Sequence, residues 1–118
     1  MATTLVISTS TELWRFSVES IIYIEAEGNY SRMHLSNGDS ELISQQLGKI
    51  EELISKQITK TESSLIRMGK SLIINKNHIY HITKTELYLR SNSEQIFQLT
   101  ASREALLQLK KLIEGESK

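Results

Sequence analysis

The stretch IIYIEAEGNY at residues 21–30 decides the fold. Its first four residues are all apolar, which is typical of a strand that is buried on both faces. After a Gly-Asn step, the chain alternates between apolar and polar residues over 30–35. The Asn-Gly pair at 37–38 predicts a tight hairpin, because both residues tolerate positive φ. These residues therefore predict antiparallel strands, with a returning strand over 39–43.

Two helices are predicted farther along the chain. Apolar residues recur at helical spacing over 47–54, and Ser44 is a candidate N-cap for this amphipathic helix of about three turns. A second helix is expected to begin near Ser102, its candidate N-cap, and to end at Ile113, ahead of a frayed tail over 114–118. Further strands are expected over 5–7, 13–18, 65–68, 72–74, 78–83, 86–90 and 95–99. The fold class is therefore mainly β with α: antiparallel sheets with one central amphipathic helix and one C-terminal helix.

Composition limits the classes of protein that the chain could be. A chain of 118 residues fits one domain, and 39% apolar residues suffice for one core. The absence of cysteine excludes disulfide scaffolds, cysteine zinc sites and cysteine nucleophiles. No apolar run approaches the roughly 20 residues that cross a bilayer, and the first residues lack the features of a secretory signal. A cytoplasmic protein without a membrane partner is therefore expected.

The charges are balanced overall but unevenly distributed. Fourteen basic and fourteen acidic residues give no net charge, which argues against a domain that binds nucleic acid through bulk charge. Residues 1–62 hold five basic and nine acidic side chains, whereas residues 63–118 hold nine basic and five acidic ones. A polyanion could dock on the basic half. Chance fluctuation in a small sample is the alternative, and both explanations stay open on this feature alone.

Signals for catalysis are weak. The sequence has no Gly-rich phosphate loop and no nucleophile motif. Glu25 and Glu27 form a carboxylate pair of the kind that is commonly solvated at the end of a strand. His78 and His81 are three residues apart, which on a strand places them on opposite faces and disfavours joint metal binding. His34 is expected at the surface. We therefore expect no enzyme, no metal, no cofactor and no small-molecule substrate.

Two polar turns between apolar runs are candidate binding segments. One is EAEGNY at 25–30, in which the Gly-Asn step at 28–29 follows the buried strand and can present Asn29 and Tyr30 outward. An ordinary turn is the alternative. In the other, RMGKS at 67–71 places two cations and a hydroxyl around a glycine, and these groups suit phosphate oxygens. The alternative here is a surface turn with a buried ion pair of Arg67.

A third candidate segment, TASRE at 100–104, leads into the predicted C-terminal helix. The N-terminus of a helix favours anions, so Arg103 in the first turn opposes the helix dipole at a slight local cost. A bidentate contact with guanine or phosphate would account for an arginine at this position. A solvated arginine is the alternative.

Together, the three segments resemble the signatures of a known family. Residues 22–30, followed by a His-Leu pair, resemble the first signature of the LytTR family of bacterial DNA-binding domains. The sequence RMGKSLIIN at 67–75 resembles the second, in which Arg-x-x-x-Ser leads into an apolar run and Asn. Residues 99–103, which lead into the last helix, resemble the third. The resemblance covers residues 4–113, with the intervening elements in the expected order.

The resemblance implies antiparallel sheets with helices packed alongside. It also implies that loops, rather than a recognition helix, enter successive major grooves of double-stranded DNA. On that basis, Lys70 or Arg103 would read guanine, and Asn29 would read an adenine edge. Tyr30 and Ser71 would be positioned against phosphate. Non-specific contacts with the DNA backbone are expected from the basic half of the chain, at Lys76, Lys84 and Arg90.

Two features depart from the family pattern. Many members carry His and Arg where this chain has Gly69 and Lys70, and lysine lacks the planar fork with which arginine binds a base. Most members also follow a phosphorylation receiver or another sensor domain. Only about a dozen residues precede the strand expected over 13–18. We therefore expect a stand-alone domain without a receiver, controlled by expression, partner proteins or oligomerisation.

The sequence thus predicts a bacterial transcription regulator similar to the output domain of a response regulator, with a DNA-binding domain over 4–113 and a flexible tail over 114–118. It is expected to bind repeated half-sites, as a homodimer on DNA, because one small neutral domain would bind weakly. The alternative is a protein-interaction module of the same fold. Such a module would modulate another regulator through an exposed sheet edge, without binding DNA itself.

Overall fold

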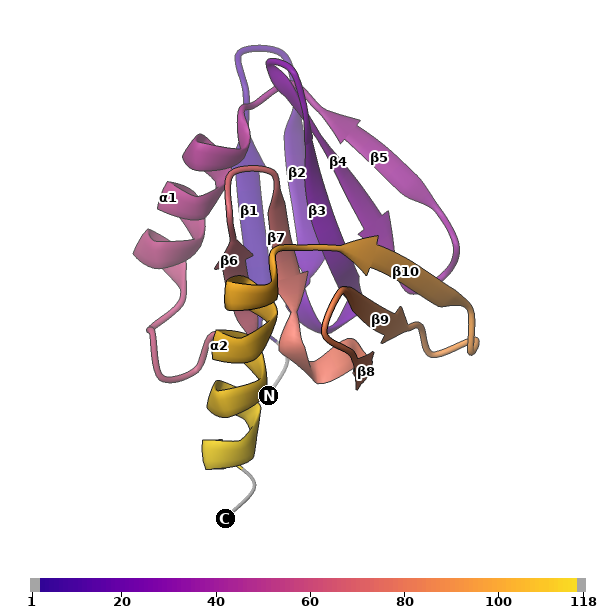
Figure 1. Ribbon diagram of the computed structural model, residues 1–118. Helices are drawn as coiled ribbons and strands as arrows, with labels where there is room; N and C mark the ends of the chain where they lie inside the picture. Colours follow the sequence, from indigo (N-terminus) through magenta and orange to yellow (C-terminus); the bar gives the residue numbers. More distant parts are fainter. Residues whose placement is uncertain (1–2, 117–118) are drawn as a thin grey trace.

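The computed structural model describes residues 3–116, which form ten strands and two helices (Figure 1). The helices are α1 (Leu47–Gln57) and α2 (Arg103–Glu116). Two 3-10 turns, η1 (Val18–Ser20) and η2 (Lys76–His78), connect strands. The strands, in chain order, are β1 (Thr4–Ser8), β2 (Leu13–Ser17), β3 (Ile21–Glu27), β4 (Tyr30–Leu35), β5 (Ser40–Ile43), β6 (Leu65–Met68), β7 (Leu72–Asn75), β8 (Ile79–Ile82), β9 (Glu86–Arg90) and β10 (Ile96–Thr100).

A five-stranded antiparallel sheet in the order β5-β4-β3-β7-β6 forms the centre of the fold. β3 lies in its middle, where Ile24 is opposite Met33 of β4 and Ile73 of β7. The four apolar residues at the start of β3 are all buried, which confirms the prediction of a strand covered on both faces. A two-stranded sheet of β1 and β2 and a three-stranded sheet in the order β10-β9-β8 accompany the central sheet.

Two hydrophobic cores lie on opposite faces of the central sheet. α1 and the β1–β2 hairpin contribute to one core, and α2 and the sheet of β8 to β10 contribute to the other. A β-bulge between Ile21 and Tyr23 interrupts the register of β3 with β4. Consequently Ile22 and Tyr23 both belong to the core on the α2 side, whereas Ile21 and Ile24 belong to the core on the α1 side.

The start of α1 differs from the sequence prediction. Ser44 is not the N-cap, because the chain bends at residues 44–45 and the helix begins only at Leu47, so that Gln46 occupies the cap position with φ −69° and ψ 154°. Gln46 makes no capping bond; its side-chain amide donates instead to the Asn29 Oδ1 at 3.0 Å. This contact fastens the turn between β3 and β4 to the segment that precedes α1.

α2 begins as predicted but ends later. The Ser102 Oγ accepts a hydrogen bond at 3.1 Å from the backbone N–H three residues on, which confirms this serine as the cap. The helix continues to Glu116, past the predicted end at Ile113, so the first part of the expected tail is helical. Residues 117–118 of that tail lie outside the described residues. Neither helix in the described chain is long and apolar enough to cross a membrane.

His78 is buried rather than part of a polar strand. It lies in η2, and β8 begins only at Ile79. Its Nδ1 is 3.0 Å from the Arg90 carbonyl oxygen, and its Nε2 is 2.7 Å from the Glu19 carbonyl oxygen. The ring therefore links η2 to η1 and to the end of β9, so His78 has a structural role in the interior and does not lie on the strand expected over 78–83.

Candidate nucleic-acid interface

Residues from all three candidate segments lie together in one hollow beside the central sheet. The Ala26 N–H, near the end of β3, donates to the Ser71 carbonyl oxygen at 2.9 Å and so joins the first segment to the second. A surface hollow of about 290 Å³ is lined by residues of β3, by Ser71 and Leu72, and by 98–100 at the end of β10. Figure 1 shows the β3–β4 turn at the top of the molecule, the β6–β7 turn below it and the β10–α2 connection lower still, with α2 running downward from that connection.

The turn between β3 and β4 presents an amide and a phenol. Gly28 adopts φ +63°, a left-handed conformation that glycine accepts without strain. The Asn29 Oδ1 accepts the bond from Gln46, whereas its Nδ2 makes no hydrogen bond within residues 3–116. Tyr30, at the start of β4, is 47% exposed. Both predicted contact residues of this turn therefore offer a polar group to a ligand.

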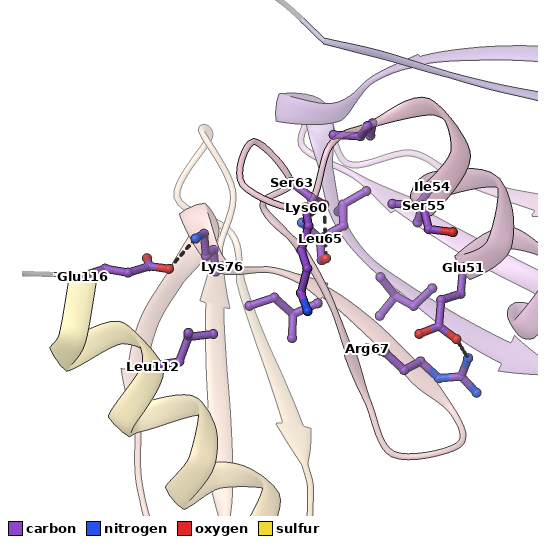
Figure 2. Close-up of a pocket in the computed structure, with 13 residues that line it drawn as sticks. Glu51, Ile54, Ser55, Lys60, Ser63, Leu65, Arg67, Lys76, Leu112 and Glu116 are labelled. Carbon is purple, nitrogen blue, oxygen red and sulfur yellow. Dashed lines mark hydrogen bonds and ion pairs between the residues drawn. The ribbon is translucent and has the colours of Figure 1, made fainter.

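Arg67 is turned toward the protein, beneath the turn between β6 and β7. Its Nε donates to the Gly69 carbonyl oxygen at 2.8 Å, and its Nη2 donates to the Lys70 carbonyl oxygen at 3.0 Å. Its Nη1 donates to the Glu51 Oε1 of α1 at 2.8 Å (Figure 2). Arg67 therefore forms the ion pair of the alternative interpretation, but the pair is not buried, because 27% of the Arg67 side chain and 50% of the Glu51 side chain are exposed. The exposed side chains of this turn are Lys70 and Ser71.

Arg103 is exposed in the first turn of α2 and lines a second hollow, of about 500 Å³. Residues 82–84, at the end of β8 and in the connection to β9, line the same hollow. Two further basic side chains, Lys84 and Lys110, lie there with Arg103. The sequence interpretation missed Lys110, although its position seven residues after Arg103 places both on one face of the helix.

Lys76 lies apart from the other predicted contact residues. It follows β7, whereas Ser71 precedes it, so roughly 16 Å of extended chain separates the two. The Lys76 Nζ is 2.5 Å from a carboxylate oxygen of Glu116 at the end of α2 (Figure 2). Its side chain is 21% exposed. A contact of Lys76 with DNA therefore requires a surface different from the three turns.

The acidic side chains near the turn between β3 and β4 interact with basic or aromatic side chains. Glu27 forms an ion pair with Arg32, and the hydrogen bond between them raises the Arg32 pKa above its usual value. The Glu25 Oε1 is 2.9 Å from the His34 Nε2. Burial, assisted by the Glu25 carboxylate, raises the pKa of Tyr23 to about 12. These contacts limit the repulsion that the two carboxylates would exert on a nearby phosphate.

His34 is not the surface residue that the sequence predicts. Tyr23 is its cross-strand partner in the register of β3 with β4, and the two rings stack with centroids 4.1 Å apart. Phe97 of β10 meets His34 edge to face at 6.1 Å. Only 17% of the His34 side chain is exposed. The third sheet therefore covers a position that would be open to solvent in an isolated hairpin.

The groups gathered at these turns are suited to hydrogen bonding. An amide, a phenol, a hydroxyl, an amine and a guanidinium can bind the edges of bases and phosphate oxygens. Across the part of the chain that the structure describes, no three His, Asp or Glu side chains are grouped so that they could hold a metal ion. The side chains present at the turns suit recognition by hydrogen bonds and charge.

The chain is similar in sequence and fold to known DNA-binding domains. The family model described as the LytTr DNA-binding domain matches residues 11–114. One solved structure with a similar fold is the LytTr DNA-binding domain of a response regulator from Bacillus cereus, with 20% identity and a TM-score of 0.62 over 96% of this chain and 98% of that chain. A search of curated proteins gave no match. Because the family model spans most of the sequence and the fold agrees, the chain belongs to the LytTR family of DNA-binding domains and is a DNA-binding protein of the type that regulates transcription.

Proposed function

We propose that this protein recognises a specific sequence of double-stranded DNA by placing its polar turns in successive major grooves. The observation that carries the proposal is that residues of the three segments lie together beside the sheet, through the bond between Ala26 and Ser71 and through the hollow shared with the end of β10. An antiparallel sheet holds the strand ends from which the turns project. Their side chains can therefore be presented to DNA with little loss of conformational entropy.

Each exposed side chain has a role in this proposal. Lys70 and Arg103 contact guanine O6 and N7, and Arg103 alone can do so with a planar fork. Asn29 reads adenine, for which its Oδ1 exchanges the bond from Gln46 for one from the base. Tyr30 and Ser71 donate to phosphates and fix the register without reading the sequence.

The remaining basic residues supply general affinity for DNA. Lys84 and Lys110 flank Arg103 in the hollow beside α2 and are placed to contact phosphates next to the base that Arg103 reads. Lys76 contributes a weaker, sequence-independent contact, because it must first leave Glu116. With no net charge on the chain, one copy has modest affinity. The proposal therefore includes two copies on repeated half-sites, as a homodimer on DNA.

Selection of bound duplexes from a random pool tests the proposal. Enrichment of a direct repeat, followed by titration of that duplex against a scrambled one at several salt concentrations, is the expected result. Binding should weaken steeply with salt for both duplexes, and the selected duplex should stay tighter throughout. An unenriched pool, with no salt-dependent binding, would reject sequence-specific recognition.

The same salt series separates DNA binding from the alternative, a protein-interaction module that pairs through a sheet edge. Pairing of strand edges hardly responds to salt. The outer strand β6 is also partly protected: the Ser63 Oγ contacts both the N–H and the carbonyl oxygen of Leu65, at 3.2 and 3.3 Å. At Leu65, therefore, the backbone N–H of β6 already has a partner within the chain.

A further inference from the structure

We propose that Glu51 of α1 is a positioning residue for the second DNA-contact turn and acts on it through Arg67. The inference rests on the proposed function, since the turn in question carries Lys70 and Ser71. Glu51 lies 16 residues before Arg67 in the chain and on a different element, and within residues 3–116 it forms no hydrogen bond or ion pair with 69–71. Its effect on DNA would therefore be indirect.

The geometry of Arg67 makes this indirect link specific. One guanidinium joins three acceptors: the carboxylate of Glu51 and the carbonyl oxygens of Gly69 and Lys70, all within 3.0 Å (Figure 2 shows the contact with Glu51). The N–H groups of a guanidinium lie in one plane in fixed directions. Fixing one of them on Glu51 therefore fixes the directions of the other two. The orientation of the Glu51 carboxylate thus sets where the two carbonyl oxygens are held.

The turn itself has little else to hold it. Gly69 has φ +64°, and no atom lies within 4 Å of the position that a Cβ would occupy there. Packing against this glycine therefore does not restrict the turn. Lys70 and Ser71 are exposed, so their side chains do not anchor it either. Besides its attachment to β6 and β7, the turn is held by the two bonds from Arg67 and by the bond between Ala26 and Ser71.

Glu51 is well placed to act as a fixed support. α1 is anchored in the core by Ile50 and Ile54, which flank Glu51 in the helix and are buried. The carboxylate itself is half exposed, and an ion pair of this kind contributes little to global stability. Loss of the carboxylate should therefore alter the turn without unfolding the domain. This separates a positioning role from a merely structural one.

The test compares Glu51→Gln with Glu52→Gln in the full chain. Glu52 is the neighbouring residue on α1 and pairs with Lys56 and Lys49 instead of Arg67, so it is a matched control. Three quantities are measured: the thermal midpoint, the affinity for the selected and scrambled duplexes by fluorescence anisotropy, and the amide hydrogen exchange of 69–71. Arg67→Lys serves as a second variant, because it keeps the charge but lacks the fork.

We expect Glu51→Gln to weaken binding of the selected duplex by about threefold and Arg67→Lys by about tenfold, in line with the modest energies of single polar contacts. Binding of the scrambled duplex and the thermal midpoint should stay within error of the control. Amide exchange at 69–71 should quicken in both variants. This last readout needs no DNA, so it still tests the inference if the proposed DNA recognition fails.

Two results would overturn the inference. One is a Glu51→Gln protein whose exchange at 69–71 and affinity for the selected duplex match those of Glu52→Gln. The other is a uniform rise in exchange across the whole domain with a lowered thermal midpoint, since that would show a purely structural ion pair. Quickened exchange confined to 69–71, together with normal melting, supports positioning by Glu51.

Discussion

Asn75, which ends the second signature, is expected to be among the polar residues that matter most to stability. It is fully buried at the end of β7. Its Nδ2 donates to the carbonyl oxygens of Val18 and Ile21, at 3.0 and 2.9 Å, and its Oδ1 accepts from the Asn77 N–H at 3.0 Å. One amide thereby joins η1, the start of β3 and η2.

The cost of Asn75→Ala follows from these three bonds. The Asn77 residue is exposed, so its N–H can turn to water. In the interior, the Ile21 carbonyl oxygen loses the Asn75 donor, and the Val18 carbonyl oxygen loses one of its two donors and keeps the Ile21 N–H. A typical hydrogen bond contributes roughly 1 kcal/mol, and a buried group left unpaired costs roughly 1–3 kcal/mol, so we expect a loss of about 3 kcal/mol. Asn75→Asp should cost more, because a carboxylate would face two carbonyl oxygens, and its protonated form could donate to only one of them.

Urea denaturation followed by circular dichroism measures these changes. The free energy of unfolding of each variant is obtained from its midpoint with a common slope. Asn77→Ala is the matched control and should change stability by less than about 0.5 kcal/mol, because the side chain is exposed. A loss below about 1 kcal/mol for Asn75→Ala, or an Asn75→Asp protein more stable than Asn75→Ala, would refute the reasoning.

Three further predictions concern DNA binding and pH. Arg103→Ala should weaken binding of the selected duplex by about 1–3 kcal/mol in a gel-shift titration and leave binding of the scrambled duplex nearly unchanged. An equal loss of affinity for both duplexes would show that Arg103 contacts a phosphate instead of a base. Lys84→Ala should weaken all sequences alike and reduce the salt slope by about 1, which a salt series on the two duplexes measures. The raised pKa of Tyr23, about 12 in the folded chain against 10.0 for a free tyrosine, favours the neutral phenol in the native state. The resulting stabilisation, on the order of 2 kcal/mol, is present below pH 10 and lost as the pH rises toward 12. Tyr23→Phe should lack this loss in urea titrations across that range.

Much of the fold could be predicted from local patterns. The apolar run at the start of β3, the alternation of β4 and the spacing of apolar residues in both helices each reflect burial of one or two faces, and burial is what such patterns record. The start of α1 could not be predicted in this way. Gln46 stays extended and bonds Asn29, and this partner lies 17 residues away in the chain.

In the candidate site, too, contacts between residues far apart in the chain could not be predicted from local patterns. The composition of a turn is recognisable in a sequence, so the exposure of Asn29, Tyr30, Lys70 and Ser71 could be predicted from the sequence alone. The residues that lie next to a basic side chain in space but far from it in the chain could not be predicted. The ion pair of Lys76 with Glu116 spans 40 residues, and the meeting of Lys84 with Lys110 depends on how α2 lies beside β8. Tertiary contacts of this kind leave no trace in local periodicity.

The open space around Gly28 and Gly69 has an evolutionary consequence. At both positions no atom lies within 4 Å of where a side chain would begin, and the residues that follow each glycine project from the sheet without entering either core. Under the proposed function, the residues that select the target sequence and the residues that hold the scaffold therefore lie in separate parts of the chain. On that proposal, a new target sequence can be acquired by exchanging a few residues at these two turns, while both cores stay unchanged. Grafting the turns of another family member onto this scaffold would test this consequence.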